Sequence, residues 1–385
     1  MIIAIDMNIP LAASAFGGLG EVRLLETTAV TPEAVRDAGA LVIRSETKVG
    51  PGLLDGSSVR FVGSATIGTD HCDLNYLRSH GITFTSAPGS NANSVKEYIL
   101  AALLALARRG GFELRGRTLG VVGVGNVGRR VAAVGRALGM RVLLNDPPRA
   151  RAEGGEEFLP LDALMEADIL TLHVPLTREG KDATFHLFDE RRLGAMKPGA
   201  ILMNTSRGAV AETRALAASL NAGRLLAAVL DVWEGEPRID ADLLRLVTLG
   251  TSHIAGYSLD GKVNAVGLVR AALCAWRGQS PSWDPVPEIP PAPTGTVTLC
   301  AGETPERSLE RAVTAAYDIE QDDRNLRALL EAPPEDRGGA FMRLRTGYRL
   351  RREFAATHVV LPGENPGLAG VLSAVGFPPP GVSRA

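Results

Sequence analysis

The sequence predicts an α/β protein whose main part is a doubly wound parallel sheet. Short apolar runs alternate with helical stretches, most of these runs are apolar throughout, and a glycine-rich turn joins one run to the next helix. Strands that alternate with helices form parallel sheets. Strands that are apolar along their whole length fit a sheet covered by helices on both faces.

The N-terminal part of the chain begins this alternation. Its predicted strands are Ile2–Ile5, Ala40–Ile43 and Phe61–Ser64, and its predicted helices are Thr31–Ala38 and Leu74–Ser79. Thr31, followed by Pro32, is expected to start its helix, because threonine is a good N-cap and proline suits the first helical position. We expect a first domain at residues 1–93, completed by about 257–280.

A second domain, residues 94–256, continues the alternation more strongly. Its predicted strands are Thr118–Val122, Arg141–Leu144, Ile169–Leu172, Ala200–Met203, Ala227–Leu230 and Val247–Leu249. Helices are predicted at Val95–Arg108, capped by Ser94, and at Asn126–Leu138. Six prolines within residues 281–293 disfavour regular helix or central strand, so residues 281–294 are a predicted semi-rigid linker.

Residues 295–385 are predicted to form a small α+β C-terminal domain. Strands are expected at Thr296–Leu299 and His358–Leu361, with a helix around Glu306–Tyr317 between them. The arginine-rich run Arg343–Arg352 is typical of a solvated helix face.

The composition limits the class of function. With 45% hydrophobic and 22% charged residues, the chain is typical of globular proteins, and its net charge of -2 argues against a general nucleic-acid or anionic-membrane surface. The longest apolar stretch, Ile99–Ala107, is far shorter than the ~20 residues that span a bilayer. Cys72, Cys274 and Cys300 form no CxxC pair and no zinc spacing, which favours a reducing cytoplasm without a disulfide framework or a metal.

The glycine-rich turn, Gly123–Gly128, has the pattern of a dinucleotide-binding site, because it follows a predicted strand and opens a helix. Gly123 permits the tight turn, and Gly125 lets the backbone approach a pyrophosphate. Gly128 lets the helix pack close to the strand, with the phosphates at the helix N-terminus. The alternative is a glycine turn needed only for packing.

Asp146 ends the next predicted strand, where a carboxylate can accept both ribose hydroxyls and would repel a 2′-phosphate. The sequence therefore predicts NAD rather than NADP as the cofactor. Arg149 and Arg151 weaken this preference slightly.

Three later segments carry an arginine, a carboxylate and a histidine, each after a predicted strand. They are Arg207 in Asn204–Gly208, Glu236 in Asp231–Pro237 and His253 in Ser252–Gly256. Open α/β sheets bind ligands at the carboxyl ends of their strands. A guanidinium matches a carboxylate, an imidazole can take a hydroxyl proton near neutral pH, and a neighbouring carboxylate fixes the imidazole tautomer. These residues indicate NAD-dependent oxidation of a 2-hydroxy acid.

Several alternatives stay open at these positions. A surface ion pair is the alternative for Arg207, a structural role is the alternative for His253, and Glu234 competes with Glu236 as the partner of the histidine. His173 is interpreted as a wall of the cofactor site, with Val174 and Pro175, rather than as a catalytic base. The other histidines, for which solvated or core positions are expected, are His71, His80, His186 and His358.

These segments together resemble the D-isomer-specific 2-hydroxyacid dehydrogenases over roughly residues 1–280. The resemblance rests on the glycine turn, Asp146, the His-x-Pro segment within Leu172–Leu176, and the three segments around Arg207, Glu236 and His253. It implies a Rossmann-type NAD-binding domain and a flavodoxin-like substrate domain, or lid, with the substrate in the cleft between them.

A narrower resemblance, to the erythronate-4-phosphate dehydrogenases, covers nearly the whole chain. Its carriers are Arg44–Val49, Ala65–His71, Ala87–Ala92, Asp231–Pro237, His253–Lys262, Tyr317–Ile319, Asp322-Asp323 and Leu344–Phe354. The last three resemble that family's dimerisation domain, which implies a homodimer. Ser90 and Ser206 stand where the family often has cysteine, and neither side chain is needed for hydride transfer.

The resemblance implies oxidation of 4-phospho-D-erythronate with NAD, a step of pyridoxal 5′-phosphate biosynthesis, and no metal. It implies Arg207, Glu236 and His253 as the catalytic residues, and substrate contacts from Ser45, Thr66 and Tyr257. The implied cofactor contacts are Asn126, Val127, Asp146, Val174, Thr205, Ser206, Arg207, Asp231 and Gly256.

Two other functions remain alternatives: another D-2-hydroxyacid dehydrogenase, such as one acting on 3-phosphoglycerate, and a non-catalytic NAD-sensing scaffold. The substrate phosphate also needs a cation. Arg44, Lys48, Lys262 and tail arginines of a partner subunit are unranked candidates for it.

Overall fold

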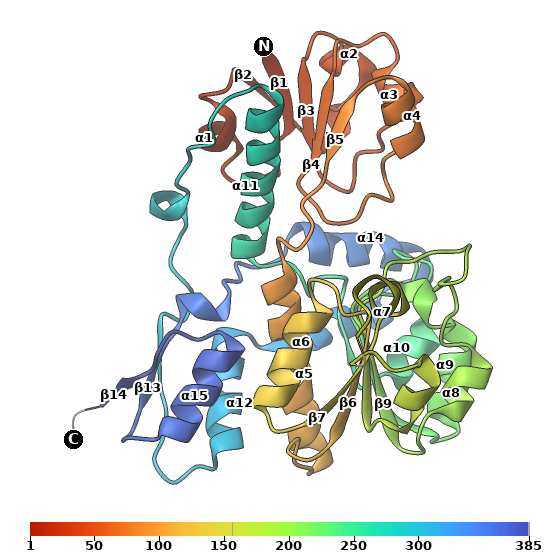
Figure 1. Ribbon diagram of the computed structural model, residues 1–385, viewed down its shortest axis with the longest axis vertical. Helices are drawn as coiled ribbons and strands as arrows, with labels where there is room; N and C mark the ends of the chain where they lie inside the picture. Colours follow the sequence, from red (N-terminus) through yellow and green to blue (C-terminus); the bar gives the residue numbers. More distant parts are fainter. Residues whose placement is uncertain (156, 384–385) are drawn as a thin grey trace. The chain divides into compact units, whose positions relative to one another are not determined.

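The computed structural model describes residues 1–155 and 157–383 and divides the chain into two compact units (Figure 1). Unit 1 comprises Met1–Asn91 and Ser258–Pro291, and unit 2 comprises Ala92–Tyr257 and the residues from Ala292 onward. The predicted α/β class with parallel sheets is confirmed in both units. The proposed boundaries of the individual domains stay a prediction.

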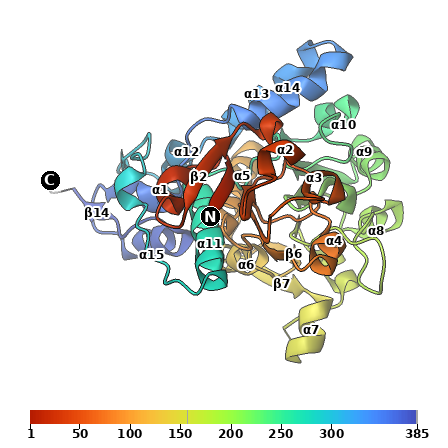
Figure 2. The same ribbon diagram turned by 90° about the horizontal axis from the view of Figure 1, so that it is seen from above.

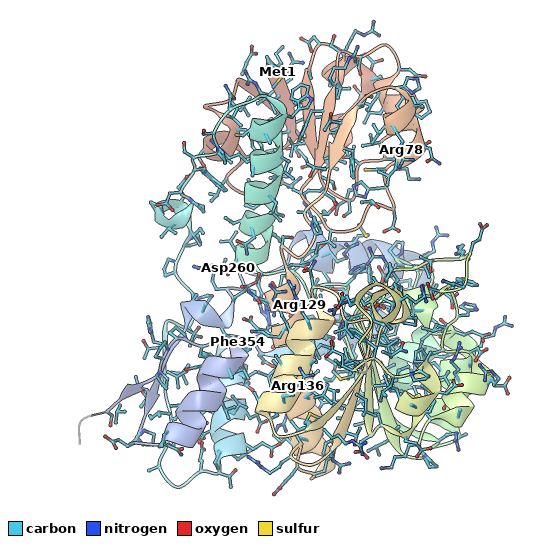
Figure 3. The ribbon with its side chains drawn as sticks, viewed as in Figure 1. Met1, Arg78, Arg129, Arg136, Asp260 and Phe354 are labelled. Carbon is cyan, nitrogen blue, oxygen red and sulfur yellow. The ribbon has the colours of Figure 1, made fainter. Side chains whose placement is uncertain are left out.

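Unit 1 is built on a five-stranded parallel sheet with the order β2-β1-β3-β4-β5. The strands are β1 (Ile2–Asp6), β2 (Glu21–Leu25), β3 (Ala40–Ile43), β4 (Phe61–Ser64) and β5 (Thr83–Thr85). Helices α1 (Ala12–Phe16) and α11 (Leu259–Trp276, with Asp260 in its first turn; Figure 3) pack on one face. Helices α2 (Pro32–Val35), α3 (Pro51–Leu54) and α4 (Leu74–Ser79) pack on the other.

The N-cap at Thr31 is confirmed, since its side chain accepts a hydrogen bond from the Ala34 N–H at 3.4 Å. The helix is shorter than predicted and ends at Val35. Strand β2 was not predicted, because Glu21–Leu25 is an edge strand with a partly exposed, mixed sequence and has no continuous apolar run.

Unit 2 contains a six-stranded parallel sheet with the order β11-β10-β9-β8-β6-β7. The strands are β6 (Thr118–Val122), β7 (Arg141–Asn145), β8 (Ile169–Leu172), β9 (Ala200–Asn204), β10 (Leu225–Leu230) and β11 (Leu249–Gly250). The strand order reverses beside β6, which lies between β7 and β8, and doubly wound sheets bind ligands at such a point.

Helices cover both faces of this sheet, which explains why strands such as β8 and β9 are apolar throughout (Figure 1 and, from above, Figure 2). One face carries α5 (Ala92–Gly110) and α6 (Gly128–Ala137). The other carries α8 (Glu190–Ala195), α9 (Thr213–Asn221) and α10 (Ala241–Leu246). In the described part of the chain, no helix is both long enough and apolar enough to span a membrane.

The prediction that Ser94 caps the apolar helix is wrong. Helix α5 already begins at Ala92, and Ser94 lies buried in its first turn. The Ser94 hydroxyl donates to the carboxylate of Glu353 at 2.8 Å, so it faces the C-terminal segment and not the N–H groups of its own helix.

Within its described residues, 292–383, the C-terminal segment forms a three-stranded parallel sheet with four α-helices. Its strands, in the order β12-β13-β14, are β12 (Thr296–Thr298), β13 (His358–Leu361) and β14 (Gly381–Val382). Its helices are α12 (Pro305–Ala316), α13 (Ile319–Arg327), α14 (Pro334–Thr346) and α15 (Pro366–Val375). Helix α12 packs against α5, and α15 packs against α6 (Figure 1). This segment therefore shares the core of unit 2.

Arg351 fastens the C-terminal segment to the rest of unit 2. Arg351 is 3% exposed, and its side chain donates to the main-chain oxygens of Ser94 at 2.7 Å and Ala255 at 3.1 Å. Its guanidinium lies 3.7 Å from the centre of the Tyr317 ring. The expectation of a solvated helix face over the run Arg343–Arg352 is wrong at this position, because α14 ends before it and Arg351 is buried.

Two neighbouring ionisable side chains on α5 complete this attachment. Glu97 accepts the N–H of Phe354 (labelled in Figure 3) at 2.9 Å, and Lys96 donates to the carbonyl oxygen of Val375 at 2.6 Å. Burial raises the pKa of Glu97 to about 8, and the nearby charges of Lys96 and Arg351 partly offset that effect. Buried polar groups of this kind are costly to leave without their hydrogen-bond partners.

We expect Arg351→Ala to lower the free energy of unfolding by about 3–5 kcal/mol, because Glu97, 3.9 Å away, and two buried carbonyl groups lose a partner. The exposed pair Arg324–Asp318 offers the control, and Arg324→Ala should cost less than about 1 kcal/mol. Urea denaturation of both variants measures the difference. Equal losses would show that the buried network does not hold the segment.

Candidate active site

Glycines shape the turn between β6 and α6. Gly123 has φ +85°, and a Cβ there would lie 2.7 Å from the carbonyl oxygen of His173. A Cβ on Gly128 would overlap the carbonyl oxygen of Gly123, so a glycine lets α6 start this close to the turn. Apart from the residues bonded to Gly125, no atom of the described residues lies within 4 Å of the corresponding point there. A ligand can therefore approach this backbone, where the first N–H groups of α6 lie.

Asp146, directly after β7, is tied to this turn. Its carboxylate accepts the N–H of Val124 at 2.8 Å and that of Arg149 at 3.1 Å, which caps α7 (Pro147–Glu153). Both basic side chains that weakened the predicted NAD preference are paired with carboxylates: Arg149 with Glu153, and Arg151 with Asp182. Arg149 also donates to the Val124 carbonyl at 2.7 Å, so its guanidinium lies at the glycine turn.

His173 and Thr205 lie together at the ends of β8 and β9. The ring of His173 is 2.9 Å from the Thr171 hydroxyl through Nε2 and 3.3 Å from the Thr205 hydroxyl through Nδ1. Burial lowers the pKa of His173 far below its ordinary value, so the ring is neutral near pH 7. A neutral imidazole engaged on both nitrogens is suited to lining a site and not to taking a proton.

Arg207 lies in a loop whose path is set by the residues on either side. The Asn204 side chain accepts from the N–H of Ser206 at 3.0 Å and from its hydroxyl at 2.8 Å, and donates to the Arg207 carbonyl at 3.0 Å. The Arg207 guanidinium donates to the Ser206 carbonyl at 2.8 Å. A Cβ on Gly208 would overlap the main chain of Trp233, so glycine lets this loop touch the segment after β10.

Glu236 and His253 form a hydrogen-bonded pair, with Oε2 of Glu236 2.8 Å from Nδ1 of His253. The other carboxylate oxygen accepts the Trp233 N–H at 2.7 Å. Burial raises the pKa of Glu236, but the hydrogen bond and charge of His253, the Trp233 N–H and the charge of Arg345 together lower it by more, and the net pKa is below its ordinary value. Glu236 is therefore ionised near neutral pH, and Nε2 of His253 is the nitrogen left for a substrate.

The backbone of His253 is strained and is held by Asp231. His253 has φ +58°, a region that costs a side-chain-bearing residue roughly 1–2 kcal/mol. The Asp231 carbonyl accepts the His253 N–H at 2.7 Å, and its carboxylate accepts from the N–H groups of Ile254 and Ala255 and from the Thr251 hydroxyl. Asp231 is only 2% exposed, so its side chain supports the loop from inside.

Glu234 pairs with His186 and not with His253. Its carboxylate is 2.7 Å from Nε2 of His186 and accepts the N–H of Thr213 at 3.3 Å. The main-chain N–H of His186 donates to the Ala209 carbonyl at 2.8 Å. His186 thus joins the loop after Arg207 to the segment that carries Glu236, a role that no local sequence motif indicated.

Tyr257, directly after Gly256, contacts an arginine of the Leu344–Phe354 segment of its own chain. Arg345 donates from Nη2 to the Tyr257 hydroxyl at 3.0 Å, although 88 residues separate the two in sequence. Only the fold brings them together, since α14 belongs to the C-terminal segment.

Unit 1 carries its candidate residues at the carboxyl ends of the neighbouring strands β3 and β4. Ser45 is exposed two residues after β3, and Thr66 follows β4 with its hydroxyl 2.7 Å from that of Ser64. Burial, and then the charge of Arg44, lower the pKa of Lys262 to about 8, so these two cations lie near each other. Lys48, the third candidate cation of this unit, is exposed.

Within residues 1–155 and 157–383, no group of three or more His, Cys, Asp or Glu side chains is arranged to hold a metal ion. The cysteines Cys72, Cys274 and Cys300 are free.

Solved structures share the fold. A Thermus thermophilus protein is 31% identical with a TM-score of 0.63, over 73% of this chain and 98% of its own. The D-lactate dehydrogenase of Aquifex aeolicus, complexed with NAD and lactic acid, is 26% identical with a TM-score of 0.58, over 72% of this chain and 96% of its own.

Sequence comparisons are more specific. Residues 95–255 match the D-isomer specific 2-hydroxyacid dehydrogenase NAD-binding domain, and residues 289–376 match a domain of unknown function, DUF3410. The erythronate-4-phosphate dehydrogenase of Salinibacter ruber is 49% identical over 91% of this chain and 92% of its own. That of Cronobacter sakazakii is 45% identical over 98% of both chains. The chain therefore belongs to the erythronate-4-phosphate dehydrogenase family, within the D-isomer-specific 2-hydroxyacid dehydrogenases.

Proposed function

We propose that this protein oxidises 4-phospho-D-erythronate at C2 with NAD⁺, giving (3R)-3-hydroxy-2-oxo-4-phosphooxybutanoate, a step of pyridoxal 5′-phosphate biosynthesis. Relatives named erythronate-4-phosphate dehydrogenase match the chain over nearly its whole length, which supports this substrate. The observation that carries the chemistry is the 2.8 Å hydrogen bond between Glu236 and His253 at the carboxyl ends of the strands.

The cofactor is NAD, and the residues of unit 2 fit it. The open backbone at Gly125, with Asn126 and Val127 at the start of α6, would hold the pyrophosphate. Asp146 would accept the ribose hydroxyls. The other residues that we assign to this site are Gly123, Gly128, Val174, Thr205, Ser206, Arg207, Asp231 and Gly256. When bound, NAD⁺ accepts the hydride that leaves C2 of the substrate.

Loss of that hydride requires the C2 hydroxyl to lose its proton. We assign this proton to Nε2 of His253, since Nδ1 faces Glu236. The ionised Glu236 then stabilises the imidazolium that forms. Arg207 binds the substrate carboxylate and stabilises the negative charge that develops on the C2 oxygen. Ser45, Thr66 and Tyr257 are the proposed further substrate contacts.

Wild-type protein should oxidise 4-phospho-D-erythronate with NAD⁺, with a kcat/KM at least ~10²-fold higher than for 3-phosphoglycerate or phosphate-free 2-hydroxy acids, because a site built for a charged group discriminates strongly. NADH absorbance in steady state measures these rates. Equal rates on phosphate-free acids would contradict the substrate. Absence of turnover on every acid, with NAD⁺ bound, would indicate a non-catalytic scaffold.

Glu236→Gln should lower kcat at least ~10-fold, because a neutral amide no longer stabilises a charged His253. Glu234→Gln is the matched control, since Glu234 pairs with His186 and glutamine can keep that hydrogen bond. We expect the control to stay within about fivefold of wild type. Equal losses in the two variants would mean that Glu236 acts only by holding its loop.

We further infer a homodimer formed through the C-terminal segment, in the cytoplasm. The resemblance of residues 317–354 to a dimerisation domain supports the first inference, and the free cysteines fit a reducing compartment. Sedimentation of the full chain should give twice the monomer mass of 40.6 kDa. A monomer at micromolar concentration would contradict the dimer.

A further inference from the structure

A basic side chain of the C-terminal segment lies beside the proposed catalytic residues of its own chain. Arg345, in the last turn of α14, donates to the Tyr257 hydroxyl at 3.0 Å, and its guanidinium lies 5.7 Å from the centre of the Tyr257 ring. Its positive charge is also among the influences that lower the pKa of Glu236. Arg345, Tyr257 and Glu236 all belong to unit 2.

Packing fixes the position of α14. Phe341 is fully buried in the same core cluster as Trp233, which lies three residues before Glu236. One turn earlier, a Cβ on Gly338 would lie 3.3 Å from the side chain of Arg238, so α14 also touches the residues just after Glu236. Residues four apart share a helix face, which places Arg345 on the side of α14 that Phe341 anchors.

Both ends of the proposed substrate are anionic, so each end needs a cation in the site. Arg207 is assigned to the carboxylate, so the phosphate at the other end needs a second cation. A guanidinium presents five N–H donors in a planar fork that matches phosphate oxygens, and bonds of this kind are strong because both partners are charged. Tyr257 is a proposed substrate contact, and Arg345 is bonded to it.

The length of the chain also supports a role for the C-terminal segment in binding the phosphate. The Aquifex D-lactate dehydrogenase, whose complex holds an acid without phosphate, matches 96% of its own length with 72% of this chain. The remainder of this chain is material that such an enzyme lacks. Residues 289–376, which match a separate domain model, contain Arg345.

We propose that Arg345 binds the phosphate of the substrate, so that the C-terminal segment of each chain sets the specificity of that chain's own site for a phosphorylated 2-hydroxy acid. This proposal rests on the proposed function. It selects an arginine of the same chain over Arg44, Lys48 and Lys262 of unit 1 as the main phosphate ligand.

Arg345→Gln in the full-length protein tests this, with Arg343→Gln as the control, because Arg343 lies on the exposed side of the same helix. We expect Arg345→Gln to lower kcat/KM for 4-phospho-D-erythronate ~10–100-fold, because the phosphate loses one or two charge-assisted hydrogen bonds. Activity on D-erythronate should change less than about threefold, and Arg343→Gln should change neither. Arg345→Lys should restore part of the loss, since it keeps the charge but not the fork.

Inorganic phosphate provides a second readout that does not need turnover of the poor substrate. It should inhibit wild type competitively with 4-phospho-D-erythronate, and its inhibition constant should rise at least ~10-fold in Arg345→Gln. NADH binding should stay unchanged, which shows that the variant is folded.

Equal losses on both acids in Arg345→Gln, or an unchanged inhibition constant for phosphate, would overturn the proposal. So would loss of the phosphate preference in Lys262→Gln but not in Arg345→Gln. These outcomes are distinct from failure of the proposed function, in which wild type itself would show no preference for 4-phospho-D-erythronate.

Discussion

The hydrogen bond between Glu236 and His253 is the interaction on which the rest of the site depends. It fixes which imidazole nitrogen meets the carboxylate and which one can meet a hydroxyl proton. The bond exists because two loops at the carboxyl ends of β10 and β11 are held rigidly. Asp231 binds the main chain around His253 from inside, and Trp233 donates its N–H to the second oxygen of Glu236.

The strained backbone of His253 fits this picture. A histidine in the left-handed region persists only where the surroundings over-determine it, and such residues cluster at functional sites. Here the buried carboxylate of Asp231 supplies that constraint. On the other side, Gly208 allows the Arg207 loop to lie against Trp233, and the pair His186–Glu234 joins the same two loops again. The loops that carry the arginine, the carboxylate and the histidine are therefore held by one connected set of hydrogen bonds and close main-chain contacts.

Much of this organisation could be predicted from the sequence because its signals are local. The strands of the central sheet are apolar runs. Thr31 is recognisable as an N-cap because Pro32 follows it. The glycine spacing of Gly123–Gly128 is recognisable because a strand packed this closely against a helix leaves no room for side chains in the turn. Edge strand β2 was not predicted because its residues are partly exposed and form no continuous apolar run. Ser94 was misassigned because a serine at the start of a helix resembles a cap, and only its buried partner Glu353, 259 residues later, shows its role.

The features that could not be predicted are the ones that join distant segments. Nothing near His186 or Arg345 in the sequence indicates a partner, and both acquire one only when the sheet and the C-terminal segment have folded. The choice between Glu234 and Glu236 as the partner of His253 was also open. The two glutamates lie two residues apart in one loop, and their spacing in the sequence does not show which of them faces the histidine. The C-terminal segment thus contributes to the site through long-range contacts, and the alternation of strands and helices gives no indication of them.

The most direct test of the account is a double-mutant cycle on kcat/KM with His253→Ala, Glu236→Gln and the double variant. If Glu236 acts through His253, its replacement in the His253→Ala background should change kcat/KM by less than about threefold, because residues that act as a unit are not additive. If the two losses multiply in the double variant, the carboxylate and the imidazole work independently and the account is wrong.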